Sequence, residues 1–400
     1  MADSRSSTTA TAPTVAAIGI PEGGEGRAVS VEWGTGERTS FNVLWLRDNC
    51  PSGGDKRSAF RSFSVAELDP SLTITAASST GAVTIDFSDG HRSTFDPVWL
   101  HAHRPGAVAV NPLSTWRADG DLPTLDMAEV RTDAGWHALL EAISVHGAAI
   151  VADVPPTNEG SSELASKLGH VRETDFGRFF DIISEPAVWT MSQSTAAMDP
   201  HTDDPYRYTP SGISILHCFE SSPTGGGRST LVDGFAVAEE IRLEAPDAFD
   251  LLTSVAVPWV RHRTESVDQG EAVHLVAHAP VISLDRDGAI AGVRFHERSM
   301  GTLDIAPDLM DGYYRALIEF TKRIRNTDFQ WEHGLRPGEA IVFDNQRVLH
   351  GRTAFDGDPG RRHLQLCTVD REQVHSTLRL LREQHATGTE HQKLPVGNLS

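Results

Sequence analysis

The chain has 400 residues, of which 39% are hydrophobic and 22% are charged, as in folded globular proteins with one large domain and a smaller one. Its 35 basic and 55 acidic residues give a net charge of -20, which disfavours binding to nucleic acid or to anionic membranes. The three cysteines, Cys50, Cys218 and Cys367, are too scattered for a disulfide framework. Without a signal-peptide pattern or an apolar run of about 20 residues, we expect a soluble cytoplasmic protein.

The N-terminal part of the chain is predicted to be rich in β-strands. Residues 1–15 are rich in Ser, Thr and Ala and are expected to form a flexible tail. From 16 to 104, apolar and polar residues alternate at 28–33, 72–75 and 82–87, between turn signals such as Asp89-Gly90. This pattern indicates a small β-rich domain, followed by a linker at 105–123 that lacks periodicity.

After the linker, helical and strand patterns are mixed. Helical spacing occurs at 125–145, 235–252 and 313–325, and in the last of these segments one face is predicted to carry Tyr314, Leu317, Ile318, Thr321 and Ile324. Strands are predicted at 148–151, 212–219, 255–260, 273–275, 340–343 and 363–369. The order indicates an α+β fold in which residues 124–390 form a double-stranded β-helix, or jelly roll, with flanking helices, before a C-terminal tail at 391–400.

A possible metal site consists of His201, Asp203 and the distant His350. Two imidazoles and one carboxylate can hold one face of Fe(II) and leave positions open, as in non-heme iron oxygenases. In an extended segment His201 and Asp203 point to the same side, while Thr202 points away. A His-x-Asp triplet also arises by chance, and the chain has 18 histidines. The prediction of a metal site is strengthened by His350, which is expected to lie on a loop after an apolar strand.

An arginine in the last predicted strand could anchor a dicarboxylate. Alternation places Arg362, Leu364, Leu366 and Thr368 on one face, which the leucines assign to the interior. An arginine that points inward needs a carboxylate partner, and 2-oxoglutarate would offer a bidentate one. The alternative is an ion pair with an acidic residue of the protein itself.

The chain resembles the γ-butyrobetaine and trimethyllysine hydroxylase branch of the Fe(II)/2-oxoglutarate dioxygenases, from about Phe41 to Gln384. The resemblance rests on a combination of motifs: Leu44-Trp45-Leu46-Arg47-Asp48-Asn49-Cys50, His201-Thr202-Asp203 with Pro205-Tyr206, Leu216-His217-Cys218, Val232-Asp233-Gly234-Phe235, and Phe343-Asp344-Asn345 before Leu349-His350-Gly351-Arg352.

The resemblance implies a set of site residues and a reaction. The iron ligands would be His201, Asp203 and His350, and 2-oxoglutarate would contact Arg362 and Ser229, with Thr230 adjacent to the latter. A small amine, amino acid or betaine-like substrate would be hydroxylated with O2, releasing succinate and CO2, in a homodimer. The carboxylate of Asp203 disfavours the related halogenase reaction. Desaturation or cyclisation at the same iron stays open.

In the small domain, the chain departs from the zinc site that the resemblance implies. Relatives hold zinc with three cysteines and a histidine, whereas the matching positions here are Cys50, Ser52, Asp55 and His91. With two thiolates missing, we do not expect zinc, although Cys50, Asp55 and His91 could be the remains of such a site.

A second departure concerns the aromatic cage that binds trimethylammonium groups in the family. The matching positions are Phe176, Phe180, Gln193 and Thr368, so two walls are polar. Such a pocket favours an amine, amino acid or different betaine over γ-butyrobetaine, although Phe176 and Phe180 could also be ordinary core residues.

Two other functional classes remain open from the residues alone. One is a metal-dependent hydrolase or isomerase that uses the same ligands without O2. The other is a binding or scaffold protein with a vestigial site, which the complete triad and Arg362 argue against.

Overall fold

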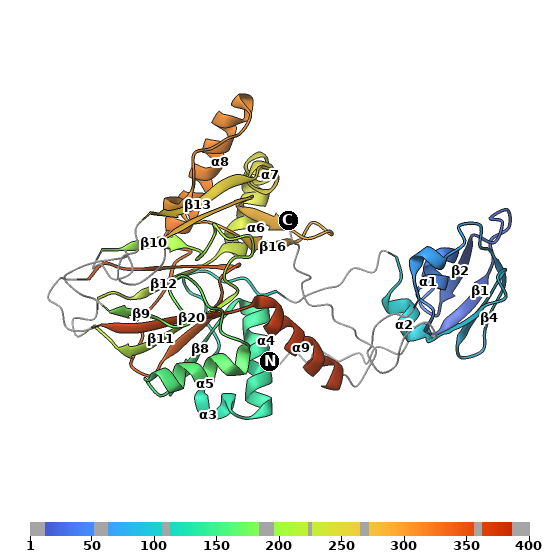
Figure 1. Cartoon of the computed structure of the whole chain (residues 1–400), viewed down its shortest axis with the longest axis horizontal. Coiled ribbons are helices and arrows are strands. Elements are labelled where there is room, and N and C mark those ends of the chain that lie inside the picture. The colour runs from blue at the N-terminus through green and yellow to red at the C-terminus, as the bar shows by residue number, and fades with distance from the viewer. Residues whose placement is uncertain are drawn as a thin grey trace, which may run out of the picture. The chain divides into compact units, whose positions relative to one another are not determined.

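The computed structural model describes residues 13–51, 63–105, 113–183, 196–222, 226–264, 272–355 and 362–385. The chain forms two compact units whose main parts are Met1–Val110 and Asn111–Arg382. Figure 1 shows the helices and strands of each unit.

The first unit is rich in β-strands, as the alternating pattern predicted. Its described residues form two three-stranded sheets, two short α-helices and one turn of 3-10 helix, Val65–Glu67. Their bounds are β1 Val15–Gly19, β2 Ala28–Trp33 and β3 Arg38–Asn42 in one sheet, β4 Ile74–Ser79, β5 Val83–Phe87 and β6 Arg92–Phe95 in the other, and helices α1 Val43–Asp48 and α2 Pro97–Ala102. The side chains of Asn42 and Asp96 cap the two helices. Alternate residues of β2 and β5, including Trp33 and Ile85, are buried in a shared core.

The second unit contains two larger sheets, the arrangement of a jelly roll. One sheet has six strands in the order β7-β8-β18-β11-β20-β9, and the other has four in the order β10-β19-β12-β17. Among the described residues, the strand pairs do not close these sheets into a barrel. The strands are β7 Thr124–Asp126, β8 Ala148–Ala152, β9 Phe180–Ile183, β10 Met198–His201, β11 Ile213–Glu220, β12 Ser229–Asp233, β17 Trp331–His333, β18 Ala340–Asp344, β19 Val348–Arg352 and β20 His363–Val369.

Helices cover the outer faces of these two sheets (Figure 1). The six-stranded sheet packs against α4 Asp133–His146, α5 Asn158–Leu168 and α9 Arg371–His385. Beyond the four-stranded sheet lie α6 Gly234–Glu244, α7 Pro246–Ser254 and α8 Pro307–Arg325, with two hairpins, β13 Val257–Arg263 with β14 Val273–Ala279 and β15 Ile282–Leu284 with β16 Ile290–Val293. Between the sheets, Phe343 and Leu364 pack with Leu231.

Two predicted helices are each divided in the structure. Residues 125–145 contain the end of β7, the short helix α3 Met127–Val130 and then α4, because the hydroxyl of Thr132 accepts a hydrogen bond from the Gly135 amide and begins a new helix. Residues 235–252 contain α6 and α7, which separate at Pro246. Proline has no backbone N–H and disfavours helical geometry in the residue before it.

The buried face of α8 differs from the face predicted for residues 313–325. Tyr314 and Ile318, which were predicted to share a face with Leu317 and Ile324, are 52% and 49% exposed. The structure instead buries Tyr313, Ala316, Leu317, Phe320 and Ile324. Both sets have helical spacing, and the tertiary contacts of α8 with α6 and α7 select the one that contains the large ring of Phe320.

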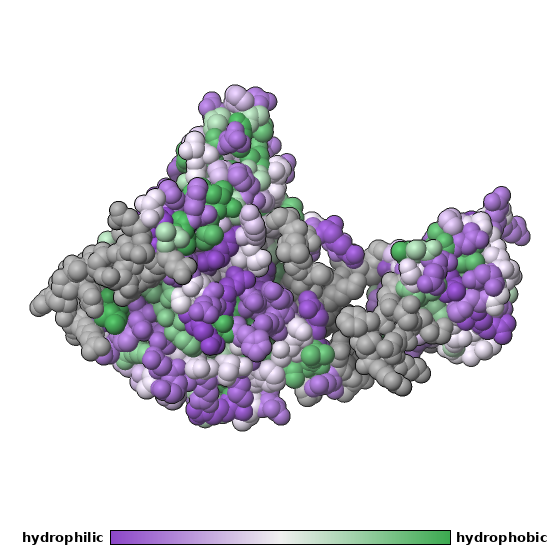
Figure 2. Space-filling model, viewed as in Figure 1, coloured by the Kyte–Doolittle hydropathy of each residue, from purple (hydrophilic) through white to green (hydrophobic). Residues whose placement is uncertain are grey.

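On the face shown in Figure 2, polar residues surround smaller apolar areas, some of them over α7 and α8. None of the helices in the described part of the chain has the length and apolar character needed to cross a membrane.

Candidate metal centre and active-site pocket

The two histidines of the predicted metal site lie on neighbouring strands of the four-stranded sheet. His201 is the last residue of β10, and His350 lies within β19. The prediction that His350 lies on a loop was therefore wrong. A tight turn at Asn345 and Gln346 lets the chain reverse directly from β18 into β19, which then pairs with both β10 and β12. His201 and His350 are Cα partners in the antiparallel pairing.

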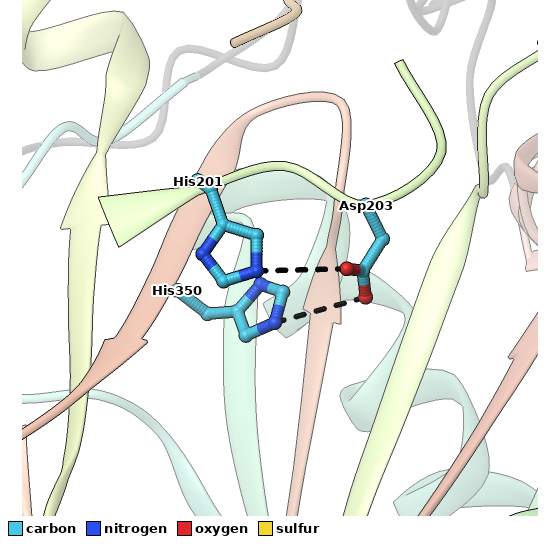
Figure 3. Close-up of side chains that lie close together, drawn as sticks. All are labelled: His201, Asp203 and His350. Carbon is cyan, nitrogen blue, oxygen red and sulfur yellow. Dashed lines mark ion pairs between the residues drawn. The ribbon is translucent and has the colours of Figure 1, made fainter. Parts of the chain in front are cut away.

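Asp203 completes a triad with these histidines (Figure 3). Its carboxylate oxygens lie 3.7 Å from His201 Nε2 and 3.7 Å from His350 Nε2. These distances exceed those of hydrogen bonds, and one possible ligand atom from each residue lies within 4.8 Å of the others. The three side chains could therefore hold a single metal ion, with the donor set that non-heme Fe(II) oxygenases use.

Hydrogen bonds to the backbone orient the triad. His201 Nδ1 lies 2.9 Å from the carbonyl oxygen of Asp199; donation from Nδ1 leaves the Nε2 lone pair directed at the centre of the triad. The Asn345 side chain accepts a hydrogen bond from the Asp203 amide at 2.8 Å and donates one to the Asp203 carbonyl at 3.0 Å. The Thr202 side chain points away, as predicted, with its hydroxyl hydrogen-bonded to the backbone of Phe295.

Burial shifts the pKa values of Asp203 and His350. It raises the pKa of Asp203, against the opposing charges of His201 and Arg261, and it lowers the pKa of His350 far below the usual histidine value. His350 is therefore neutral and can offer a lone pair. Its Nδ1 is buried and has no hydrogen-bond partner among the described residues. A divalent cation would supply positive charge that stabilises the ionised carboxylate of Asp203. The three residues therefore fit a metal ion.

The triad opens into a cavity of about 470 Å³. Three of the predicted substrate residues, Phe176, Phe180 and Thr368, line the same cavity. The rings of Phe176 and Phe180 are 4.9 Å apart, and the Thr368 hydroxyl donates a hydrogen bond to the carbonyl of Ile213. The fourth predicted residue, Gln193, lies outside the described residues.

Arg362 and Ser229 are buried but do not line this cavity. The guanidinium of Arg362 donates to the carbonyl of Gly227 at 3.3 Å, and burial lowers its pKa to about 10. No carboxylate among the described residues pairs with Arg362. The alternative considered from the sequence, an ion pair with an acidic residue of the protein, is therefore not found within that part of the chain.

The register of β12 separates Ser229 from Thr230. Ser229 is opposite Arg352 and Leu231 is opposite His350, so the side chains of Ser229, His350 and Arg352 share one sheet face. Thr230 belongs to the opposite face. Of the two hydroxyls considered from the sequence, only that of Ser229 is on the same face as His350.

In the small unit, Cys50 Sγ lies 3.1 Å from His91 Nε2. Burial, followed by the charge of Arg47, lowers the pKa of His91. Asp55, the third residue of the possible degraded zinc site, lies outside the described residues, as does Ser52.

Several residues at the site were not identified from the sequence. The ring of His296 lies 4.4 Å from that of His201, and Arg261 and Tyr206 line the cavity. Asn345 and Tyr206 were quoted within motifs but without a role. His296 and Arg261 come from segments far from either ligand motif, so only the tertiary contacts reveal them.

Comparisons with known proteins identify the same chemistry. The family model for the taurine catabolism dioxygenase TauD, TfdA family matches residues 109–368, and that for the γ-butyrobetaine hydroxylase-like N-terminal region matches residues 23–101. A γ-butyrobetaine dioxygenase of Pseudomonas sp. (strain AK-1) is 33% identical over 367 residues, covering 88% of this chain and 93% of that protein.

Two further relatives are similar over most of their length. The mitochondrial trimethyllysine dioxygenase of Gallus gallus is 30% identical, covering 85% of this chain and 83% of that protein. The γ-butyrobetaine dioxygenase of Pongo abelii is 27% identical, covering 90% of this chain and 96% of that protein. Together with the His-Asp-His triad, these matches show that the chain belongs to the TauD/TfdA family and is an Fe(II)/2-oxoglutarate-dependent dioxygenase.

Proposed function

We propose that His201, Asp203 and His350 bind Fe(II), and that the enzyme hydroxylates an unactivated C–H bond of a small amine, amino acid or betaine-like substrate. The observation that carries this proposal is the triad at the end of a cavity of about 470 Å³. The reaction converts the substrate, 2-oxoglutarate and O2 into the hydroxylated product, succinate and CO2. This family membership favours an oxygenase over the hydrolase, isomerase and scaffold alternatives.

Arg362 and Ser229 are proposed to hold 2-oxoglutarate. An arginine buried without a carboxylate partner among the described residues can form a bidentate pair with the distal carboxylate of the co-substrate. The hydroxyl of Ser229 lies on the sheet face that also carries His350 and could donate to the same carboxylate. Fe(II), when bound with 2-oxoglutarate, supplies the oxidation of the C–H bond.

The protein's own residues position the reactants. Phe176, Phe180 and Thr368 are proposed to contact the substrate and keep one C–H bond near the metal. His201 is buried and Asp203 and His350 are partly buried, which restricts water around the reacting atoms and limits competing reactions. Hydroxylation is the proposed outcome; desaturation or cyclisation of a natural-product intermediate is the alternative, which the mass of the product distinguishes.

A direct test is anaerobic spectroscopy. Fe(II) with 2-oxoglutarate should give a visible metal-to-ligand absorption in the wild type and none in His201→Ala, with His278→Ala as a control because His278 is an exposed histidine outside the triad. A wild type that is loaded with metal and lacks this absorption would contradict the proposal. Succinate formation coupled to O2 uptake then separates an oxygenase from a hydrolase or isomerase.

We also propose a cytoplasmic homodimer. Support for the dimer comes from the exposed pair Tyr314 and Ile318, which are one helical turn apart on α8. Light scattering of the wild type and of Ile318→Lys would test it, since a dimer that uses this face should dissociate in the variant. Cell fractionation tests the location.

A further inference from the structure

The guanidinium of Arg261 lies between two aromatic rings of the active-site cavity. Its Cζ is 4.2 Å from the ring centroid of Phe176 and 5.4 Å from that of Tyr206. Arg261 belongs to β13, and all three residues line the cavity that contains the triad. Phe176 is one of the two aromatic walls predicted to face the substrate. The cation site that these rings could offer is thus occupied by a cation of the protein itself.

Arg261 is held in place by a network of charged and polar groups. Its Nη2 lies 2.8 Å from Asp175 Oδ2, and its Nη1 donates to the Tyr206 hydroxyl at 2.9 Å. The Tyr206 hydroxyl in turn donates to Asp204. Asp175 also pairs with Arg207 at 2.6 Å. Because the Arg261 side chain is only 20% exposed and is fixed at both ends of the guanidinium, its position is built into the pocket.

The remaining charges of the cavity also disfavour a cationic ligand. Apart from Asp203 in the triad, the acidic residues of the lining, Asp199, Asp204 and Glu297, are each paired with an arginine. Two further lining arginines, Arg178 and Arg298, are exposed and have no ion pair among the described residues. The cavity is thus complementary to a negatively charged group.

We propose that Arg261 determines substrate specificity: it excludes a trimethylammonium group from the aromatic site and directs a carboxylate of the substrate toward the guanidinium. This inference rests on the proposed function and narrows its substrate class to an acid whose nitrogen, if present, is not quaternary. A quaternary cation would lose access to the face of Phe176 and would meet the like charge of Arg261. A carboxylate would gain a charge-assisted hydrogen bond from a free N–H of the fork.

The test is a gain of binding in Arg261→Met. Wild type and variant are loaded anaerobically with Fe(II) and 2-oxoglutarate, and choline, which has a trimethylammonium group but no carboxylate, is titrated while its effect on the visible absorption is recorded. Removal of the guanidinium opens the aromatic site, so the variant should bind choline at least about tenfold more tightly than wild type, the gain expected for a cation on an aromatic face. Asp175 keeps Arg207 as its partner in the variant, which favours retention of the fold.

Arg298→Met is the matched control, because Arg298 lines the same cavity without a ring beside its guanidinium in the described structure. It should leave the affinity for choline unchanged. Arg261→Gln, which keeps a polar side chain, provides a second variant if Arg261→Met does not fold, and it should also gain affinity.

The outcomes separate the two proposals. Equal affinity in wild type and both Arg261 variants, including no detectable binding to any of them, overturns the specificity role of Arg261. Equal gains in the Arg261 and Arg298 variants overturn it as well, because they would reflect net charge alone. Loss of the Fe(II)–2-oxoglutarate absorption in the wild type would instead contradict the proposed function.

Discussion

His201 and His350 face each other as Cα partners across β10 and β19, with their ring centroids 4.4 Å apart. The two histidines lie far apart in the sequence, yet one antiparallel strand pair sets the distance between them in space. Because neighbouring strands are held at a fixed spacing, this pairing sets the distance between the two histidines.

A metal ion bound by His201 and His350 should therefore stabilise the folded enzyme. A ligand that binds only the folded state, at about 100 times its Kd, adds about 2.7 kcal/mol to the free energy of unfolding. We expect Fe(II), or Mn(II) as a redox-stable substitute, to raise the Tm of the wild type and of His278→Ala but not that of His350→Ala, as measured by anaerobic calorimetry. An unchanged metal-induced shift in His350→Ala would show that the metal binds elsewhere.

Asn345 should control the position of Asp203. Its side chain bonds both the amide and the carbonyl of Asp203 and also donates to the carbonyl of Ser211 at 3.1 Å. We expect Asn345→Ala to weaken metal affinity by roughly 10-fold to 100-fold, as for other groups that orient metal ligands. Gln346→Ala, in the same turn, is the control. Equal metal affinity in both variants, measured by competition with a chelating dye, would exclude this positioning role.

Arg362 should determine the affinity for 2-oxoglutarate. A lysine would retain the charge but not the two parallel hydrogen bonds, so Arg362→Lys should raise the KM for 2-oxoglutarate at least about tenfold, and Arg362→Met should raise it further. The exposed Arg228 gives the control variant Arg228→Lys. The KM is measured by succinate formation. Variants at Arg362 with the wild-type KM would place the co-substrate elsewhere.

The buried pair of Arg347 and Asp233 should be a major source of stability. Two hydrogen bonds, of 3.0 and 2.8 Å, join the side chains, and Asp233 also caps α6 by accepting from the Phe235 amide. Removing one partner leaves a buried charge, so Asp233→Ala should lower the free energy of unfolding by about 3–5 kcal/mol. Denaturation by urea measures the change. A matched variant of the exposed pair of Asp86 and Arg92, Asp86→Ala, should lower the free energy of unfolding much less.

Stability should fall as the solution becomes acidic, partly because of two buried histidines. Burial lowers the pKa of His217 to about 4 and that of His375 to about 4, against about 6.5 in an unfolded chain. Between these values the unfolded state binds more protons than the folded state, so the free energy of unfolding decreases as pH falls from about 6.5 to 4. Urea denaturation across this range should show a weaker dependence in His375→Asn. An identical slope in that variant would exclude His375 as a contributor.

Periodicity and local residue chemistry were enough to indicate much of the fold. Alternation identified the strands around Trp33, Ile85 and Leu364, and it placed Leu364 toward the interior, as its core contacts confirm. Hydrophobic periodicity could not show which face of α8 is buried, because two overlapping sets of apolar residues have helical spacing. The strand that carries His350 was missed because only a short turn separates it from β18, and its five residues, Val348–Arg352, include Gly351 and show no apolar–polar alternation.

The sequence by itself determined the donor set of His201, Asp203 and His350, because those residue types and the flanking motifs carry the chemistry of the family. Only the tertiary structure decided what surrounds the donors. Pairing of β10 with β19 sets the distance between the histidines, the Asn345 turn orients Asp203, and β13 brings Arg261 onto the face of Phe176. These contacts join segments that are far apart in the chain, and no local pattern encodes which of many possible partners each segment meets.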